Sequence, residues 1–75
     1  MTEQLTIQLQ RAEGALVRLL GLTERRGFPM VSVHAIPTGA DSLLVQLTVR
    51  SERPIEKLTH QLAKLYEVQR VEKTP

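Results

Sequence analysis

Alternation of apolar and polar residues in two stretches, broken only at Leu44, is the feature that most constrains how this chain can fold. Leu, Ile and Leu alternate with Thr and Gln over residues 5–10, and Leu, Val, Leu and Val occupy every second position from 43 to 49. Successive side chains of a β-strand point to opposite faces, so a period of two is typical of a half-buried strand. We therefore predict strands at about 4–10 and 42–50.

Two other segments carry apolar residues at helical spacing. The stripes consist of Leu16, Leu19, Leu20 and Thr23 in the first segment, and of Ile55, Leu58, Leu62 and Leu65 in the second. We predict helices at about 14–26 and 54–65. Gly27 follows two arginines and suits the left-handed conformation that ends many helices. Pro54 is tolerated in a first helical turn, where its missing N–H has little effect.

Two further strands complete the pattern, at about 30–36 and 66–72. In the first, Val31, Val33 and Ala35 share one parity, and Met30, Ser32, His34 and Ile36 share the other. In the second, Val68 and Val71 differ in parity, so that strand is short or bulged. The order predicts an α+β, ferredoxin-like βαββαβ sandwich: a four-stranded antiparallel sheet with two helices on one face, in a single domain over residues 1–75.

The length and composition indicate a small folded domain that needs a partner. A core built from 75 residues has limited stability, and without cysteine neither disulfides nor thiolate metal sites can reinforce it. We therefore expect oligomerisation. No apolar run approaches the roughly 20 residues of a membrane span, and the first residues lack the features of a signal peptide. These observations predict a cytoplasmic protein that binds no membrane.

The charged and reactive residues favour neither nucleic-acid binding nor catalysis. The net charge is +2, and the basic residues are scattered without a readable stripe. His34 and His60 have no acidic or Cys neighbour at ligand spacing, so we expect no metal site. No Ser or Thr lies in a nucleophile arrangement and no phosphate-binding loop is present. We expect no catalytic residues.

Two other protein classes share the predicted order of elements but lack support in the residues. RNA-recognition motifs stack bases on aromatic residues of their central strands, whereas this chain has only Phe28 and Tyr66, both at the ends of predicted elements. Enzymes of the acylphosphatase type need a water-orienting Asn, and the sequence contains no Asn. These absences favour a non-catalytic binding module.

Three short motifs, in their order and spacing, resemble one known family. They are Gly14-Ala15-Leu16, Arg26-Gly27-Phe28, and Gln61-Leu62-Ala63-Lys64-Leu65 running into Val68 and Val71. Together they resemble the ACT domains of acetolactate synthase small subunits, in particular the short, isozyme II-type subunit. The resemblance implies a non-catalytic regulatory subunit of branched-chain amino-acid biosynthesis that binds and activates the acetolactate synthase catalytic subunit. Thiamine diphosphate, Mg²⁺ and FAD would belong to that partner, with no cofactor in this chain.

The resemblance also implies an effector site between two paired domains. ACT domains commonly hold an amino acid between the loop after the first strand and the start of the second strand of a paired domain. The matching positions are Arg11, Ala12, Glu13, Gly14, Ala15 and Leu16 in the loop, with Pro29 and Met30 at the second strand. Backbone N–H groups at a helix N-terminus can bind a carboxylate that Gly14 would let approach; alternatively, Gly14 only permits a tight turn. Both explanations stay open.

Two positions of this site depart from the family pattern. In valine-responsive relatives Asn occupies the places of Arg11 and Pro29. Asn offers a donor and an acceptor, whereas Arg only donates and Pro lacks even its N–H. Arg11 could pair with the carboxylate of an amino acid but would repel its ammonium group. We therefore predict a weak or absent response to valine.

The remaining sheet surfaces are candidates for protein contacts. The face away from the helices is expected to present Thr6, Gln8, Ser32, His34, Ile36, Leu44, Gln46 and Thr48. Such a mixed face suits burial against a partner. ACT domains also commonly pair through sheet edges, which predicts a homodimer. The alternative function is a stand-alone amino-acid-sensing homodimer, which uses the same loop and sheet.

Overall fold

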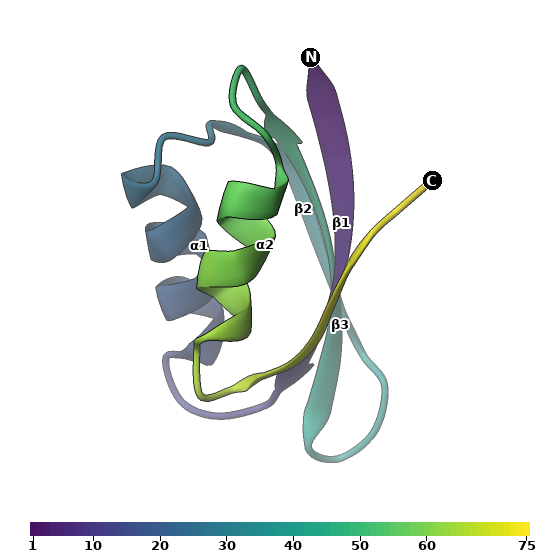
Figure 1. Ribbon diagram of the computed structural model, residues 1–75. Helices are drawn as coiled ribbons and strands as arrows, with labels where there is room; N and C mark the ends of the chain where they lie inside the picture. The colour runs from purple at the N-terminus through teal and green to yellow at the C-terminus, as the bar shows by residue number, and fades with distance from the viewer.

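A computed structural model describes residues 1–75 and has the order βαββαβ. The strands are β1 (Thr2–Gln10), β2 (Met30–Pro37), β3 (Ser42–Arg50) and β4 (Val68–Lys73), and the helices are α1 (Ala15–Arg25) and α2 (Glu56–Ala63). The strands form one antiparallel sheet in the order β2-β3-β1-β4. Both helices lie on the same face of this sheet (Figure 1). The predicted ferredoxin-like sandwich is confirmed.

The core lies between the two central strands and the helices. Alternate residues of β1 and β3 are fully buried, and the register places Ile7 opposite Val45. The fully buried strand residues are Leu5, Ile7, Leu9, Val45, Leu47 and Val49. Leu19 of α1 and Leu58 of α2 cover them from the helix side. The alternation in the sequence therefore reflects a sheet that is covered by helices on one face only.

Helix α1 ends in a well-formed glycine cap. Gly27 has a φ of 84°, its N–H donates to the carbonyl of Glu24 (3.0 Å), and the N–H of Phe28 donates to the carbonyl of Thr23 (3.2 Å). This pair of bonds satisfies carbonyls that the helix leaves free, and it commonly carries a hydrophobic residue after the glycine. Phe28 fills that role with 1% of its surface exposed. The predicted helix end at Gly27 is confirmed.

Helix α2 and strand β4 are shorter than the sequence predicted. Pro54 lies just ahead of the helix, where the N–H of Lys57 donates to the Pro54 carbonyl in a four-residue turn (3.1 Å). The N–H of Leu65 likewise donates to the Leu62 carbonyl (3.0 Å), so the helix tightens after Ala63. A further turn bond from the N–H of Val68 to the Leu65 carbonyl delays the start of β4 to Val68.

Both edge strands carry an irregularity. In β4 the register shifts by one residue between Arg70 and Val68, which confirms a short, bulged strand. In β2 the register shifts between Met30 and Ser32, so Met30 pairs with Val49 and packs against the core. The expectation that Met30 shares a face with Ser32 was therefore wrong. A bulge inserts one extra residue and reverses the parity of everything beyond it.

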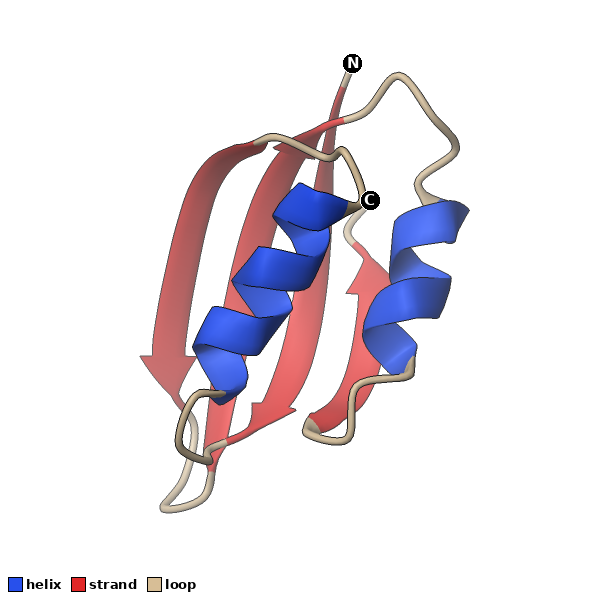
Figure 2. Ribbon diagram, turned by 90° about the vertical axis from the view of Figure 1, so that its left-hand side faces the viewer, coloured by secondary structure: helices blue, strands red, loops and turns tan.

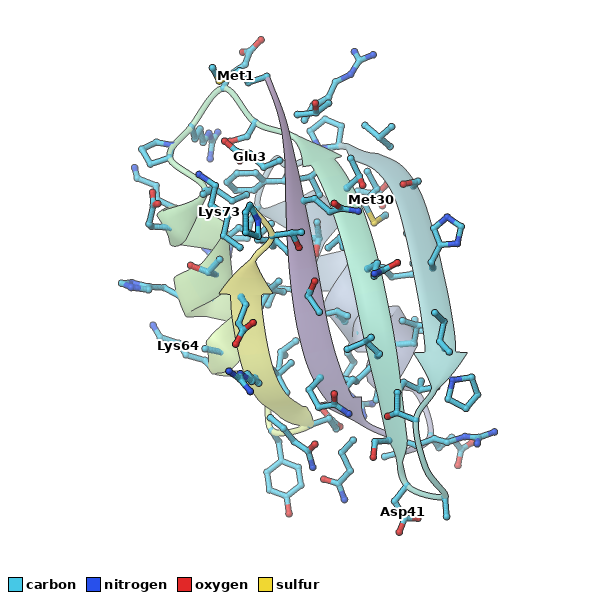
Figure 3. The ribbon with its side chains drawn as sticks, turned by 90° about the vertical axis from the view of Figure 1, so that its right-hand side faces the viewer. Met1, Glu3, Met30, Asp41, Lys64 and Lys73 are labelled. Atoms are coloured by element: carbon cyan, nitrogen blue, oxygen red, sulfur yellow. The ribbon has the colours of Figure 1, made fainter.

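The face without helices carries the residues expected there. The register aligns Thr6 with Gln46 and Gln46 with His34, and it aligns Gln8 with Leu44 and Leu44 with Ile36. Figure 3 shows this open face with its side chains. Neither helix has the length and apolar character needed to cross a membrane.

Candidate functional site

The loop between β1 and α1 is held at both ends by backbone hydrogen bonds. The N–H of Arg11 donates to the carbonyl of Asp41 in the β2–β3 hairpin (2.8 Å), and the N–H of Ala15 donates to the Ala12 carbonyl (3.0 Å). The first turn of α1 has no side-chain cap, and the N–H groups of Leu16 and Val17 bind no protein acceptor. The helix start therefore presents two donors to an external acceptor, next to an exposed loop.

The conformation of Gly14 explains why the loop needs glycine there. Gly14 has a φ of 77°, in the left-handed region that residues with a Cβ rarely adopt. A Cβ at this position would lie 2.8 Å from Nη1 of Arg18. The tight turn alone accounts for the glycine.

An ion pair that the sequence did not reveal lies directly beside this loop. Arg18 of α1 donates from Nη2 to the carboxylate of Glu67, and also to the carbonyl of Glu13 (3.2 Å). Glu67 precedes β4, and its own carbonyl accepts the N–H of Gln10 (2.7 Å). The Arg18 side chain thus ties the loop to the end of the helical layer. Arg18 and Glu67 are 49 residues apart in the chain, so no local pattern could have linked them.

The hydrogen bond from Arg18 lowers the pKa of Glu67 below its ordinary value, and partial burial of the carboxyl opposes this shift. Glu67 is therefore ionised near neutral pH and neutralises Arg18 beside the loop. An amino-acid carboxylate at the loop would have to compete with Glu67 for Arg18.

The two halves of the predicted effector site lie at opposite ends of the sheet. Met30 pairs with Val49, and Val49 pairs with Glu3, whereas the loop begins immediately after Gln10. Seven residues of strand separate these two positions of β1, which is about 23 Å at 3.3 Å per residue. Figure 3 shows Met30 near one end of the sheet and Asp41, whose carbonyl binds Arg11, at the other. One copy of the chain therefore cannot bring Arg11 and Pro29 together.

Pro29 lies in a shallow surface depression of its own. The depression has a volume of about 330 Å³ and is lined by Gly27, Pro29, Arg50, Glu52 and Arg53. The Pro29 carbonyl is engaged, because it accepts the N–H of Arg50 (2.8 Å). The polar groups that line this depression therefore belong to Arg50, Glu52 and Arg53, and not to Pro29 itself.

The imidazoles and acidic residues form no site of their own. No group of three or more His, Cys, Asp or Glu residues lies close enough together to hold a metal ion. His34 is exposed on the open face opposite Gln46, and His60 is exposed on α2. The two histidines are thus on different elements, with His34 on the sheet and His60 on the helical layer.

Comparison with known proteins relates both sequence and fold to one family. Residues 11–71 match the ACT domain family. The chain is 36% identical over 73 residues to the acetolactate synthase small subunit of Buchnera aphidicola, and 35% identical over 74 residues to the acetolactate synthase isozyme 3 small subunit of Escherichia coli. Each alignment covers 95% of this chain, but only 46% and 45% of these relatives, so the chain spans about half of their length.

Solved structures share the fold at low sequence identity. The ACT domain from GTP pyrophosphokinase of Chlorobium tepidum superposes with a TM-score of 0.86 at 13% identity, covering 99% of this chain and 97% of that one. The acetolactate synthase small subunit of Thermotoga maritima gives a TM-score of 0.86 at 21% identity, covering 97% of this chain and 47% of that one. Taken with the match over residues 11–71, these likenesses show that the chain belongs to the ACT domain family.

Proposed function

We propose that this ACT domain is a non-catalytic regulatory module of an acetolactate synthase, which binds the catalytic subunit and activates it. The observation that carries the proposal is the identity of 36% and 35% to acetolactate synthase small subunits across 95% of the chain. Such a module alters catalysis only by favouring one conformation of its partner.

The module acts as a homodimer that pairs through the β2 edge. β2 is an edge strand, so one row of its backbone N–H and C=O groups lies outside the sheet. It also exposes apolar side chains: Val31 is 54% exposed, Val33 36% and Ile36 49%. Two copies that align these edges would bury this surface and join their sheets. Such burial supplies the stability that a 75-residue core lacks.

Antiparallel pairing of two β2 edges also completes the effector site. A two-fold axis across the edge sets the Met30 end of one β2 beside the Pro37 end of the other. Pro37 pairs with Leu43, which pairs with Leu9, so this end of the sheet carries the loop from Arg11 to Leu16. The two half-sites that lie about 23 Å apart in one copy would then face each other across the dimer.

Branched-chain amino acids bind this composite site weakly or not at all. Arg11 offers only donors to a ligand, and Pro29 offers no N–H. Arg18, the cation beside the loop on α1, is already paired with Glu67. A carboxylate could still reach the free N–H groups of Leu16 and Val17. The cationic side chain of Arg11 repels the ammonium group, and Glu13 is the one carboxylate of the loop that opposes this repulsion.

The decisive experiment measures acetolactate production by the catalytic subunit of the same organism, with and without the chain, and again with added valine, leucine or isoleucine. A rise in activity that the amino acids leave unchanged supports the proposal. No rise, together with separate elution of the two proteins on a sizing column, overturns it. If the separate chain is then a dimer whose melting temperature rises with added amino acid, the stand-alone sensor is the correct function.

A further inference from the structure

A basic groove runs over the outer side of the helical layer, where the end of α1 meets α2. The groove has a volume of about 300 Å³. Five of its lining residues are basic, namely Arg26, Arg53, Lys57, His60 and Lys64, and Gln61 lies among them. The end of α1 and the start of α2 lie at the same end of the sheet (Figure 2), which brings Arg26 next to Arg53.

The spacing along α2 explains how scattered residues form this groove. Lys57, Gln61 and Lys64 follow one another at intervals of four and three residues, which places them on one face of the helix. The distance from Lys57 to Lys64 along the helix axis is about 10 Å, at 1.5 Å per residue. The buried face of the same helix carries Leu58 and Leu62. This row therefore sets two cations, Lys57 and Lys64, about two helical turns apart along one side of the groove.

No carboxylate neutralises this row. The three ion pairs of the chain involve Arg18, Arg70 and Lys73, none of which lines the groove. Arg53 has a structural use, because its Nη1 donates to the carbonyl of Arg26 at the end of α1 (3.2 Å) and its guanidinium packs against Gly27. The side chains of Lys57 and Lys64 make no hydrogen bond or ion pair. Like charges gathered in this way attract an anionic partner.

We infer that the basic groove binds an acidic segment of the acetolactate synthase catalytic subunit, through carboxylates set about two helical turns apart. This inference rests on the proposed function and names the surface that performs it. A protein partner is favoured over a nucleic acid because the groove exposes no aromatic ring on which bases could stack, Phe28 being buried. The chain also carries a net charge of only +2.

The test compares two double variants with the same change in net charge. Lys57→Gln with Lys64→Gln removes two cations from the groove, and Arg70→Gln with Lys73→Gln removes two cations from β4 that do not line the groove. All four side chains lie on the surface, so both variants should fold, which circular dichroism checks. Affinity for the catalytic subunit is measured by calorimetry from about 50 mM to about 500 mM salt.

We expect the groove variant to weaken binding about three- to tenfold at low salt, with a difference that shrinks as salt rises. The β4 variant should stay within about twofold of the unmodified chain. If the unmodified chain binds and the groove variant binds equally well, the groove inference is wrong while the proposed function stands. If the unmodified chain does not bind the catalytic subunit, the proposed function fails, and the inference fails with it.

A second arm identifies the class of partner. Titration with a single-stranded oligoribonucleotide should give no saturable binding. Tight binding of the RNA by the unmodified chain that the groove variant loses would overturn the assignment to a protein partner.

Discussion

Replacing Gly14 by alanine is the sharpest test of how the loop before α1 is built. Gly14 has a φ of 77°, and an L-residue in the left-handed region costs about 1–2 kcal/mol. The added Cβ would also lie 2.8 Å from Nη1 of Arg18, which must move away. That atom is the end of a flexible side chain, so the contact is relieved at small cost and the backbone strain dominates.

We expect Gly14→Ala to lower the stability of the fold, and a control variant, Gly21→Ala, to raise it. A destabilisation of about 1–2 kcal/mol lowers the melting temperature of a domain of this size by about 4–8 °C for each kcal/mol. The control is Gly21→Ala within α1, where the new Cβ would meet only Nη1 of Arg25 at 3.5 Å. Alanine in a helix interior is about 0.5–1 kcal/mol more favourable than glycine, so this variant should melt at a higher temperature.

Thermal unfolding followed by circular dichroism measures both variants, and urea unfolding gives the free energies. Comparing the double variant Gly14→Ala with Arg18→Ala against Arg18→Ala alone separates the two contributions, because both lack the Arg18 side chain and its pair with Glu67, and only one carries the new Cβ. If Gly14→Ala leaves the melting temperature unchanged, the left-handed turn is not required, and the glycine serves the approach of a ligand instead. A loss of stability in both glycine variants would show that volume, and not backbone conformation, decides the outcome.

Three further outcomes follow from the same structure. The hydrogen bond from Arg18 lowers the pKa of Glu67, so this pair stabilises the fold fully above pH 4.5 and loses its effect as the pH falls through the lowered pKa. The urea midpoint of Glu67→Gln should therefore drop less on acidification than the urea midpoint of the unmodified chain. Val33→Lys on the β2 edge should shift the chain from dimer to monomer in analytical ultracentrifugation, whereas the exposed control Tyr66→Lys should not. Arg11→Asn should strengthen valine binding in calorimetric titration, and no change would refute the role given to this cation.

The sequence predicted the central strands well because their physical cause is local. A strand covered on one face must alternate, and residues 5–10 and 43–49 do so without exception on the buried side. The glycine cap after α1 was predictable for the same reason, since the φ of 84° at Gly27 is a local requirement. The side of the sheet on which Met30 lies could not be predicted. A bulge between Met30 and Ser32 adds one unpaired residue to β2, and the apolar pattern does not reveal it.

Contacts between residues that are far apart in the sequence could not be predicted from any local pattern. The Arg18–Glu67 pair joins residues 49 positions apart. The basic groove combines the end of α1 with residues of α2, so basic residues that are scattered in the sequence become a row in space. Only the interval from Lys57 to Lys64, two helical turns, was visible beforehand, and one pair of cations does not define a surface.

The positions of the proposed surfaces make simultaneous binding feasible. The β2 edge lies at one end of the strand order β2-β3-β1-β4, whereas α2 packs against β4 at the other end. A dimer joined through β2 would therefore leave the basic groove of each copy free for one catalytic subunit. Arg53 lines both the depression around Pro29 and the basic groove, so an amino acid bound between the copies would lie close to the groove; it could also act through a shift of α1 against α2. Arg18 ties α1 to Glu67 in the segment between α2 and β4, so this ion pair joins the two parts of the helical layer that such a shift would move.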